Sequence, residues 1–226
     1  MRRLVFPLIL ALCWVAPAQA TIIISEYVDG GGKDQAIELY NYGSIAIDIT
    51  GWMIDIYLDG STVVTRSVTL SGSIDPGDVF VIARNKADAE ILAVADLVDK
   101  NVKYNGNDAI VLTDGTDPID RVGQVGFDPG TEWGSGDLST KDNTIQRDIG
   151  ANPDPGIFNL FSLADWGGWP DGSYGGLGFP GVQLPESPTH VMILMGLIPM
   201  GMLRARARRR GRISIGRLQS PSRSAR

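Results

Sequence analysis

The sequence predicts an all-β fold, an antiparallel β-sandwich with one short helix. Short apolar segments rich in β-branched residues recur along the chain, and in several of them apolar and polar positions alternate. Clusters of Gly, Asp and Pro separate these segments and are typical of tight turns. Apolar residues at helical spacing occur in one segment of the folded region, so a single short helix is expected.

The first two expected strands organise the rest of the chain. Residues 22–27 and 36–40 are rich in β-formers and flank a connector that contains Gly30, Gly31 and Gly32. In the second segment apolar and polar residues alternate, which is the pattern of a half-buried strand. The glycines join two strands rather than a strand and a helix, so they indicate a flexible turn and not a phosphate-binding loop.

Five further strands follow from the same reasoning. They are expected at residues 52–58, 63–70, 79–83, 109–113 and 119–123, with turns at 59–60, 75–78 and 114–115. A helix is expected between the third and fourth of these, capped by Asn85 and with apolar positions up to Val98. From Phe127 to Gly178 the chain is rich in Gly, Pro, Asp and Trp, and only residues 144–147 look like a strand.

Residues 1–20 are expected to be a secretory signal peptide. Arg2 and Arg3 precede a short apolar run, and Ala18-Gln19-Ala20 has the form of a signal-peptidase site, which places cleavage after Ala20. Signal peptidase is therefore an expected partner. The one cysteine of the chain, Cys13, lies in this segment, so the mature chain has no disulfide or thiolate site. Residues 21–180 are expected to form the β-sandwich domain.

The C-terminal part predicts transient or lasting contact with a membrane. Residues 181–190 form a linker containing Pro185 and Glu186, residues 191–203 are hydrophobic, and residues 204–226 are basic. By the positive-inside rule the basic tail stays cytoplasmic while the apolar run stalls in the bilayer. The order of Pro185-Glu186, the apolar run and the arginines Arg208, Arg209 and Arg210 resembles a PEP-CTERM sorting signal. That resemblance implies processing by an exosortase-type enzyme; the alternative is a short permanent transmembrane anchor.

Several separated motifs resemble the lamin tail domain of secreted bacterial proteins. They are Ile24–Tyr27, Ala36–Asn41, Ile49–Trp52, Leu70–Gly72, Ile74–Ala83, Asn105–Leu112, Phe127–Gly134 and Ala164–Trp166. The resemblance implies an immunoglobulin-like sandwich that acts as a binding or structural module and not as a catalyst. In such proteins the domain often stands beside an extracellular nuclease domain.

Charge and composition narrow the classes of function. The region from Thr21 to Leu184 holds 25 acidic and 9 basic side chains, a net charge of −16. Such a surface repels nucleic-acid phosphates, so direct nucleic-acid binding is not expected, whereas calcium binding is compatible with it. The single histidine, His190, lies in the tail, which excludes an imidazole acid, base or metal ligand from the domain.

Acidic turns supply the candidate metal ligands. Hard oxygen ligands on turns suit calcium, although no segment has the EF-hand pattern, and solvated turn carboxylates are the alternative. No other cofactor is expected. The candidate ligands are Asp114, Asp117 and Asp120, with Asn105, Asn107 and Asp108 just before the preceding strand.

Two further groups of residues are candidates, one for binding a ligand and one for catalysis. Trp166 and Trp169 lie in a Gly-rich segment and can stack on sugars or bases, or else pack a long loop onto the sandwich. Glu26 and Glu38 lie on neighbouring strands and are the one catalytic option, because they can approach one another as the carboxylates of a glycosidase do. The alternative is that both decorate an outward sheet face or that one accepts hydrogen bonds structurally.

These observations predict an exported, non-catalytic module at the cell surface or in the extracellular matrix. Its expected partners are an envelope polysaccharide or a surface protein. The alternative is an accessory module for a separately encoded extracellular nuclease, which would bind DNA or the enzyme.

Overall fold

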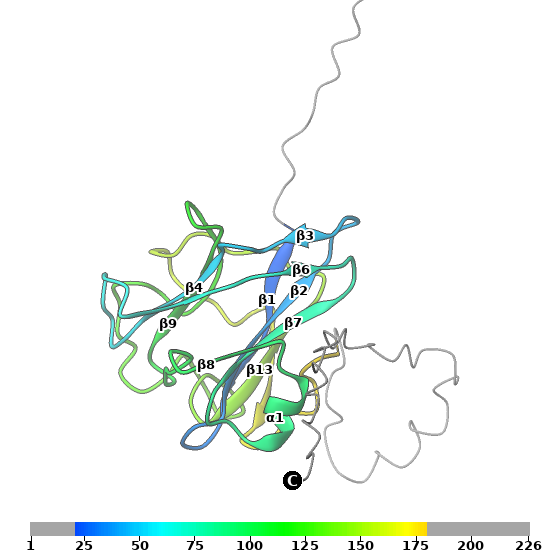
Figure 1. Cartoon of the computed structure of the whole chain (residues 1–226). Coiled ribbons are helices and arrows are strands. Elements are labelled where there is room, and N and C mark those ends of the chain that lie inside the picture. The colour runs from blue at the N-terminus through cyan, green and yellow to red at the C-terminus, as the bar shows by residue number, and fades with distance from the viewer. Residues whose placement is uncertain (1–20, 180–226) are drawn as a thin grey trace, which may run out of the picture. The chain divides into compact units, whose positions relative to one another are not determined.

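Two β-sheets packed face to face form the fold, which the computed structural model describes over residues 21–179 (Figure 1). The larger sheet has the strand order β14-β13-β1-β2-β7-β8 and the smaller β10-β9-β4-β5. The larger sheet comprises β1 (Ile22–Asp29), β2 (Gln35–Asn41), β7 (Val79–Arg84), β8 (Leu97–Asp99), β13 (Asn143–Arg147) and β14 (Trp166–Pro170). The smaller comprises β4 (Met53–Tyr57), β5 (Arg66–Thr69), β9 (Ala109–Thr113) and β10 (Pro118–Val122).

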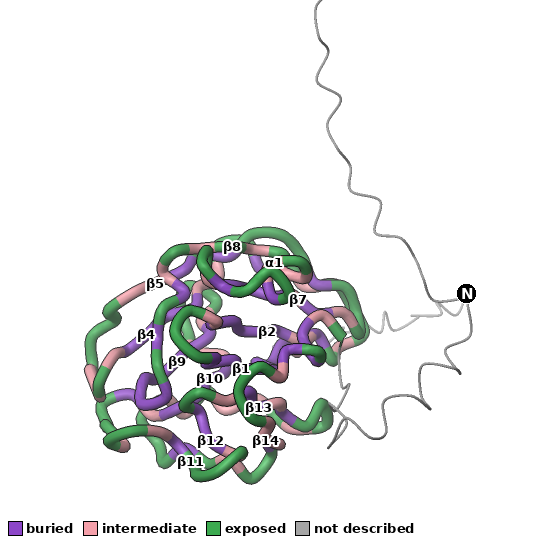
Figure 2. The backbone as a smooth tube through the Cα atoms, turned by 90° about the horizontal axis from the view of Figure 1, so that it is seen from below, coloured by how far each residue is buried: buried purple, intermediate pink, exposed green. Residues whose placement is uncertain are grey.

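Two short ribbons complete the strands. β3 (Ile47–Asp48) pairs with β6 (Ser73–Ile74), and β11 (Gly134–Ser135) pairs with β12 (Leu138–Ser139). The expected all-β sandwich with one short helix is confirmed. Figure 2 shows that burial follows the strands, while most of the connecting loops are exposed.

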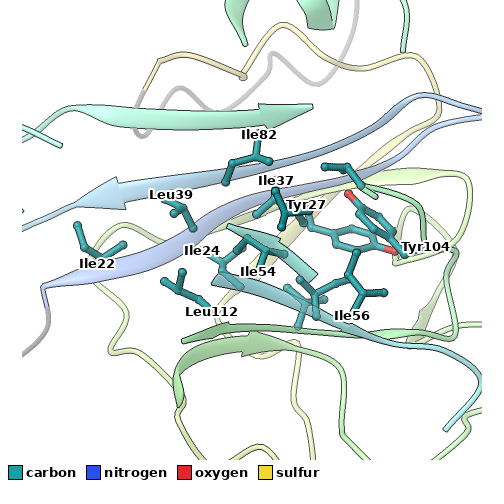
Figure 3. Close-up of a cluster of buried hydrophobic side chains, with 14 of the residues drawn as sticks. Ile22, Ile24, Tyr27, Ile37, Leu39, Ile54, Ile56, Ile82, Tyr104 and Leu112 are labelled. Atoms are coloured by element: carbon teal, nitrogen blue, oxygen red, sulfur yellow. The ribbon is translucent and has the colours of Figure 1, made fainter. Parts of the chain in front are cut away.

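The main core lies between the two sheets. Figure 3 shows aliphatic side chains of β1, β2 and β7 opposite those of β4 and β9. Ile37 and Leu39 of β2 are fully buried there, as the alternating pattern of that segment predicts. Tyr104 closes one end of this core: its ring lies 5.0 Å from that of Tyr27. Its hydroxyl lies within 2.9 Å of the carbonyl oxygens of Val28 and Ala36.

The helix is shorter than the sequence predicts. Helix α1 spans Ala89–Val94 and is capped by Asp88, whose carboxylate accepts the Ala89 N–H at 2.5 Å, so the expected cap at Asn85 is wrong. Val98, expected on the helix, lies instead on β8, which pairs in parallel with β7. Parallel neighbours need a crossover connection, and α1 supplies it.

A second apolar cluster lies on the outer face of the larger sheet. Ile91 of α1 packs there against Val28, Ala36, Val81 and Ala83. Tyr174 and Leu177 join the same cluster from the C-terminal end of the described chain. In Figure 1, α1 accordingly lies on the side of the larger sheet that faces away from β4 and β9. This sheet is therefore covered on both faces.

The segment around the two C-terminal tryptophans is a strand, contrary to the expectation of a loop. β14 pairs antiparallel with β13 over five residues, from Asn143 opposite Pro170 to Arg147 opposite Trp166. Gly167 and Gly168 hide the strand pattern, because glycine contributes no apolar periodicity. Gly168 has no room for a side chain, since a Cβ there would overlap the backbone of the β11–β12 hairpin.

A buried arginine holds the long connection between β13 and β14. Arg121 of β10 is 1% exposed, and its guanidinium donates to the carboxylate of Asp154 at 2.7 and 3.0 Å. It also donates to the backbone carbonyls of Gly123, Asn159 and Leu160. One charged side chain thus replaces the backbone ladder that this irregular segment lacks.

A second buried ion pair joins the two sheets. Arg147 of β13 donates to both carboxylate oxygens of Asp120 on β10, at 2.7 and 2.5 Å. The same carboxylate accepts the Ile24 N–H of β1 at 2.7 Å and the Asp154 N–H at 2.8 Å. The Asp120 side chain is 0% exposed, and its carboxylate accepts hydrogen bonds from three separate segments of the chain.

No helix within residues 21–179 is long and apolar enough to cross a membrane. The expected signal peptide at 1–20, the linker, the hydrophobic segment at 191–203 and the basic tail all lie outside the described residues.

We expect Arg147→Met to lower the free energy of unfolding by about 3–5 kcal/mol, because the substitution leaves the Asp120 carboxylate buried without its cation. Urea unfolding followed by tryptophan fluorescence measures the change.

Arg84→Met is the matched control. Arg84 is half-buried on β7 and donates to Gln35 and to the carbonyl of Gly32. Its loss should cost about 1 kcal/mol. Equal losses for the two variants would contradict a special role for the Arg147–Asp120 pair.

Candidate functional site

A cavity of about 520 Å³ opens on the outer face of the larger sheet, over β13, β14 and the start of β1. It is polar at its floor and has an aromatic side chain in its wall. The lining residues are Ser25, Glu26, Glu38, Gln146, Arg147, Asp148, Ile149, Ala164, Asp165, Trp166, Gly167, Trp169 and Phe179.

A β-bulge in β1 puts Glu26 into this cavity. Ile24 pairs with Leu39 and Glu26 pairs with Glu38, so Ser25 is an extra residue on β1. Ile22 and Ile24 face the core before the bulge, and simple alternation would place Glu26 beside them. The extra residue reverses the alternation, because two residues of the bulged strand oppose one residue of its neighbour.

Four polar or small residues then form a row across the sheet. Gly167 pairs with Gln146, Gln146 with Glu26, and Glu26 with Glu38. Cross-strand partners point to the same face of a sheet, so these side chains lie next to one another along the cavity floor. The hypothesis that Glu26 and Glu38 approach one another is therefore confirmed. Both side chains lie on the outer face of the sheet and accept structural hydrogen bonds, as the alternative had it, but they are covered there, at 1% and 2% exposed.

Neutral donors satisfy three of the four carboxyl oxygens. Glu38 accepts hydrogen bonds from the Ser25 hydroxyl at 2.8 Å and from the Gly178 N–H at 2.7 Å. Glu26 Oε2 accepts one from the Gln146 side-chain amide at 2.6 Å. Glu26 Oε1 is buried and has no hydrogen-bond partner within the described part of the chain. This oxygen is the one unsatisfied acceptor of the pair.

Residues 174–179, here called the closing segment, cover part of the pair. The Gly178 N–H reaches Glu38, and Gly176 lies so close to Gln146 and Glu26 that a Cβ there would overlap both side chains. Tyr174 and Leu177 anchor the segment in the outer apolar cluster. The closing segment thereby takes both carboxyl groups out of water.

Burial changes the acidity of both groups. Desolvation raises the pKa of Glu38 to about 7, with Asp96 and Asp78 adding to the effect, against the hydrogen bonds from Ser25 and Gly178. Desolvation and the proximity of Glu38 raise the pKa of Glu26 well above its usual value, although the Gln146 bond opposes this. The pair therefore retains a proton near neutral pH.

The structure brings the two candidate tryptophans to the same cavity by different routes. Trp166 is 7% exposed, and the Arg147 guanidinium lies 5.2 Å from its ring centroid, so this ring mainly packs the edge of the core. Trp169 is half-buried on the outer face, and its ring lies across Gly167, 2.8 Å from where a Cβ would stand. Trp169 is thus the better placed of the two to touch a ligand.

The three aspartates proposed for calcium do not come together. Asp114 and Asp117 lie on an exposed turn, where the N–H groups of Asp117 and Thr116 hold the pKa of Asp114 below its usual value. Asp120 is instead buried in its ion pair with Arg147. Within residues 21–179 no three His, Cys, Asp or Glu side chains are grouped closely enough to hold a metal ion.

The other oxygen ligands considered for calcium line a second cavity, of about 690 Å³. There the carboxylate of Asp108 accepts the N–H groups of Asp59 and Asn105, and the Asn107 amide donates to Asp59 and Asp128. These contacts hold loops to one another.

The sequence does not single out Gln146 and Ser25, although both bond the glutamate pair. Gln146 alternates with the buried Ile145 and Arg147, which is the available signal that it faces outward. The bulge that brings Ser25 to Glu38 leaves no such trace. Ala20, Pro185, Glu186, Arg208, Arg209 and Arg210, the predicted cleavage and sorting residues, lie outside the described residues.

Comparison with known proteins supports the resemblance seen in the sequence. A family model described as Lamin Tail Domain matches residues 15–126. That family is one of immunoglobulin-like, non-catalytic domains, and the two-sheet architecture found here is that of a lamin-tail-like sandwich. No curated protein matches the chain. The match includes Glu26 and Glu38 but ends before β13, β14 and the closing segment, which supply the rest of the cavity.

Stability should depend on pH through Glu38. Because its pKa rises from 4.5 in the unfolded chain to about 7 in the folded one, its contribution is present below pH 4.5 and is lost as the pH rises through about 7. Glu38→Gln mimics the protonated acid, so it should remove up to about 3 kcal/mol of this decline. Urea unfolding at a series of pH values measures both slopes.

Glu90→Gln, an exposed position on α1, serves as the control and should leave the slope unchanged. A Glu38→Gln variant with the wild-type slope would show that this carboxyl group titrates normally.

Proposed function

We propose that the protein is an exported, non-catalytic module that binds a saccharide of the cell envelope or extracellular matrix in the cavity of Glu26 and Trp169. The observation that carries the proposal is the combination in one cavity of a half-buried indole with a buried carboxyl oxygen that lacks a donor. Aromatic faces pack on sugar rings, and carboxyl groups accept hydrogen bonds from ring hydroxyls.

The shape and composition of the cavity fit such a ligand. Its volume of about 520 Å³ is that of a site for one or a few sugar rings. Polar groups from β1, β2 and β13 converge on its floor, while Trp169 and Phe179 supply apolar surface. A few converging polar groups beside apolar walls are what orient a small ligand.

Binding rather than hydrolysis is favoured by the way the two glutamates are held. In glycosidases the paired carboxyl groups flank the scissile bond from opposite sides. Here both groups lie side by side on adjacent strands. The two carboxyl oxygens of Glu38 already accept hydrogen bonds from the Ser25 hydroxyl and the Gly178 N–H. This arrangement favours a site that binds a sugar over one that cleaves it.

Nucleic acid fits this cavity less well than a saccharide. Four of its lining residues are acidic and one, Arg147, is basic and already bonded to Asp120. Phosphate groups would be repelled by the cavity and by the net charge of −16 on residues 21–184. The role of a DNA-binding accessory to a nuclease is therefore the weaker proposal.

The proposed location at the cell surface rests on the sequence of the two ends of the chain. A signal peptide ending at Ala20 would lead to export, and the segment from Pro185 to Arg210 would be read by an exosortase-type enzyme. A membrane contact through residues 191–203 would then be transient, and the domain would be displayed at or released from the cell surface.

Trp169→Ala should weaken retention on envelope polysaccharide from the source cells at least about tenfold, because the variant loses the stacking face of the cavity. Affinity electrophoresis in gels that contain the polysaccharide measures the retention. Phe158→Ala, which removes a 64% exposed ring that does not line the cavity, is the control. Unchanged retention of a folded Trp169→Ala protein would refute the proposal.

The protein recovered from its native cells should begin at Thr21 and end close to Pro185. Intact-mass measurement with sequencing of both termini tests this. Recovery of a product that still carries Arg208–Arg210 would mean that the sorting proposal is wrong and that the tail is retained.

A further inference from the structure

The floor of the cavity holds an uncompensated acidic pair. Glu26 and Glu38 are direct cross-strand partners, and their side chains are only 1% and 2% exposed. All their hydrogen-bond donors in the described chain, namely Ser25, Gln146 and the Gly178 N–H, are neutral. Two carboxyl groups so placed cannot both ionise without a cation nearby.

Among residues 21–179, the cavity lining offers only one cation, and that cation is already paired. The other charged residues of the lining are Asp148, Asp165 and Arg147, and the guanidinium of Arg147 forms the ion pair with Asp120 on the core side. Asp78 and Asp96 act on Glu38 from the β7 side and add further negative charge. A positively charged group entering the cavity would therefore face four lining carboxyl groups and one arginine that is already paired with Asp120.

The unsatisfied oxygen indicates where that group would bind. Glu26 Oε1 is buried, lacks a donor among the described residues, and belongs to a side chain of the cavity floor. A primary ammonium group carries three N–H donors and one positive charge, whereas a sugar hydroxyl carries one donor and no charge. An ammonium group therefore satisfies the oxygen and compensates the pair at once, which a hydroxyl group does not.

We propose that the cavity selects a saccharide bearing a free primary ammonium group, an amino sugar that is not N-acetylated, with the ammonium at Glu26 and Glu38 and the sugar ring against Trp169. This inference rests on the proposed saccharide-binding function and adds the class of sugar. N-acetylation would remove the charge, and a uronic acid or sugar phosphate would be repelled.

Binding of the ammonium group should release a proton from the carboxyl pair. The raised pKa values of Glu26 and Glu38 mean that the empty pair retains a proton near neutral pH, which an entering cation displaces. Affinity should consequently be highest at the pH where the pair has lost this proton and the amine still holds its own.

The test is calorimetric titration of the full-length chain with three oligosaccharides of equal length, made of glucosamine, N-acetylglucosamine and glucose. The glucosamine oligomer should bind at least about tenfold more tightly than the other two, as expected for one partly buried charge pair. Titration in two buffers of different ionisation enthalpy should reveal release of a proton for this oligomer alone.

Matched variants separate a local from a general charge effect. Glu26→Gln should abolish both the preference and the proton release, and Glu38→Gln should do the same. The amide oxygen at position 38 can still accept the Gly178 N–H, while its NH2 group can donate to the Ser25 hydroxyl. Glu90→Gln removes one exposed charge outside the cavity and should retain both. If all three variants reduce the preference equally, the overall charge of the domain causes it and the inference is wrong.

The remaining outcomes distinguish the two proposals. Equal affinity for the glucosamine and glucose oligomers would overturn the ammonium site and leave the saccharide-binding function in place. Binding of none of the three oligomers, together with Trp169-independent retention on envelope polysaccharide, would overturn both.

Discussion

The ion pair between Arg147 and Asp120 is the interaction on which the rest of the arrangement depends. It joins β13 of the larger sheet to β10 of the smaller one inside the core, where neither charge can be hydrated. An unpaired carboxylate in this position would be severely destabilising, so the two sheets must be aligned to within hydrogen-bond geometry. The spare capacity of Asp120 is used for backbone N–H groups of Ile24 and Asp154.

The bond from Ile24 to Asp120 also links the core to the cavity. It fastens β1 directly before the bulge at Ser25, and the bulge decides which face Glu26 occupies. With Glu26 on the outer face, the closing segment can cover it together with Glu38, and desolvation then keeps a proton on the pair. The ion pair in the core and the glutamate pair on the outer face are thus joined through a single strand, β1.

The elements predicted correctly are short apolar runs bounded by turn residues, whether their side chains alternate, as in β2 and β4, or are apolar on both faces, as in β7. β2, β4, β7, β9 and β10 were all predicted within a few residues, because each presents an apolar face to the same core. The errors have physical causes. Val98 follows an amphipathic segment, but it lies on β8, which pairs with the edge of β7. Gly167 and Gly168 have no side chains that could show the alternation of a strand, and β14 is a strand because its backbone pairs with that of β13.

The glutamate pair was recognisable from its place on adjacent strands. Its burial was not, since the closing segment lies 140 residues from Glu38 in the chain.

The Lamin Tail Domain match and the physical unit of folding have different ends. The matched region stops at residue 126, yet β13 supplies the strand beside β1, the counter-ion of Asp120 and one wall of the cavity. A gene fusion or duplication that copied the matched region alone would transfer a sandwich with an open edge and a stranded charge. A transplanted copy would therefore need β13 and β14 as well as the matched region to keep the large sheet complete and Asp120 paired.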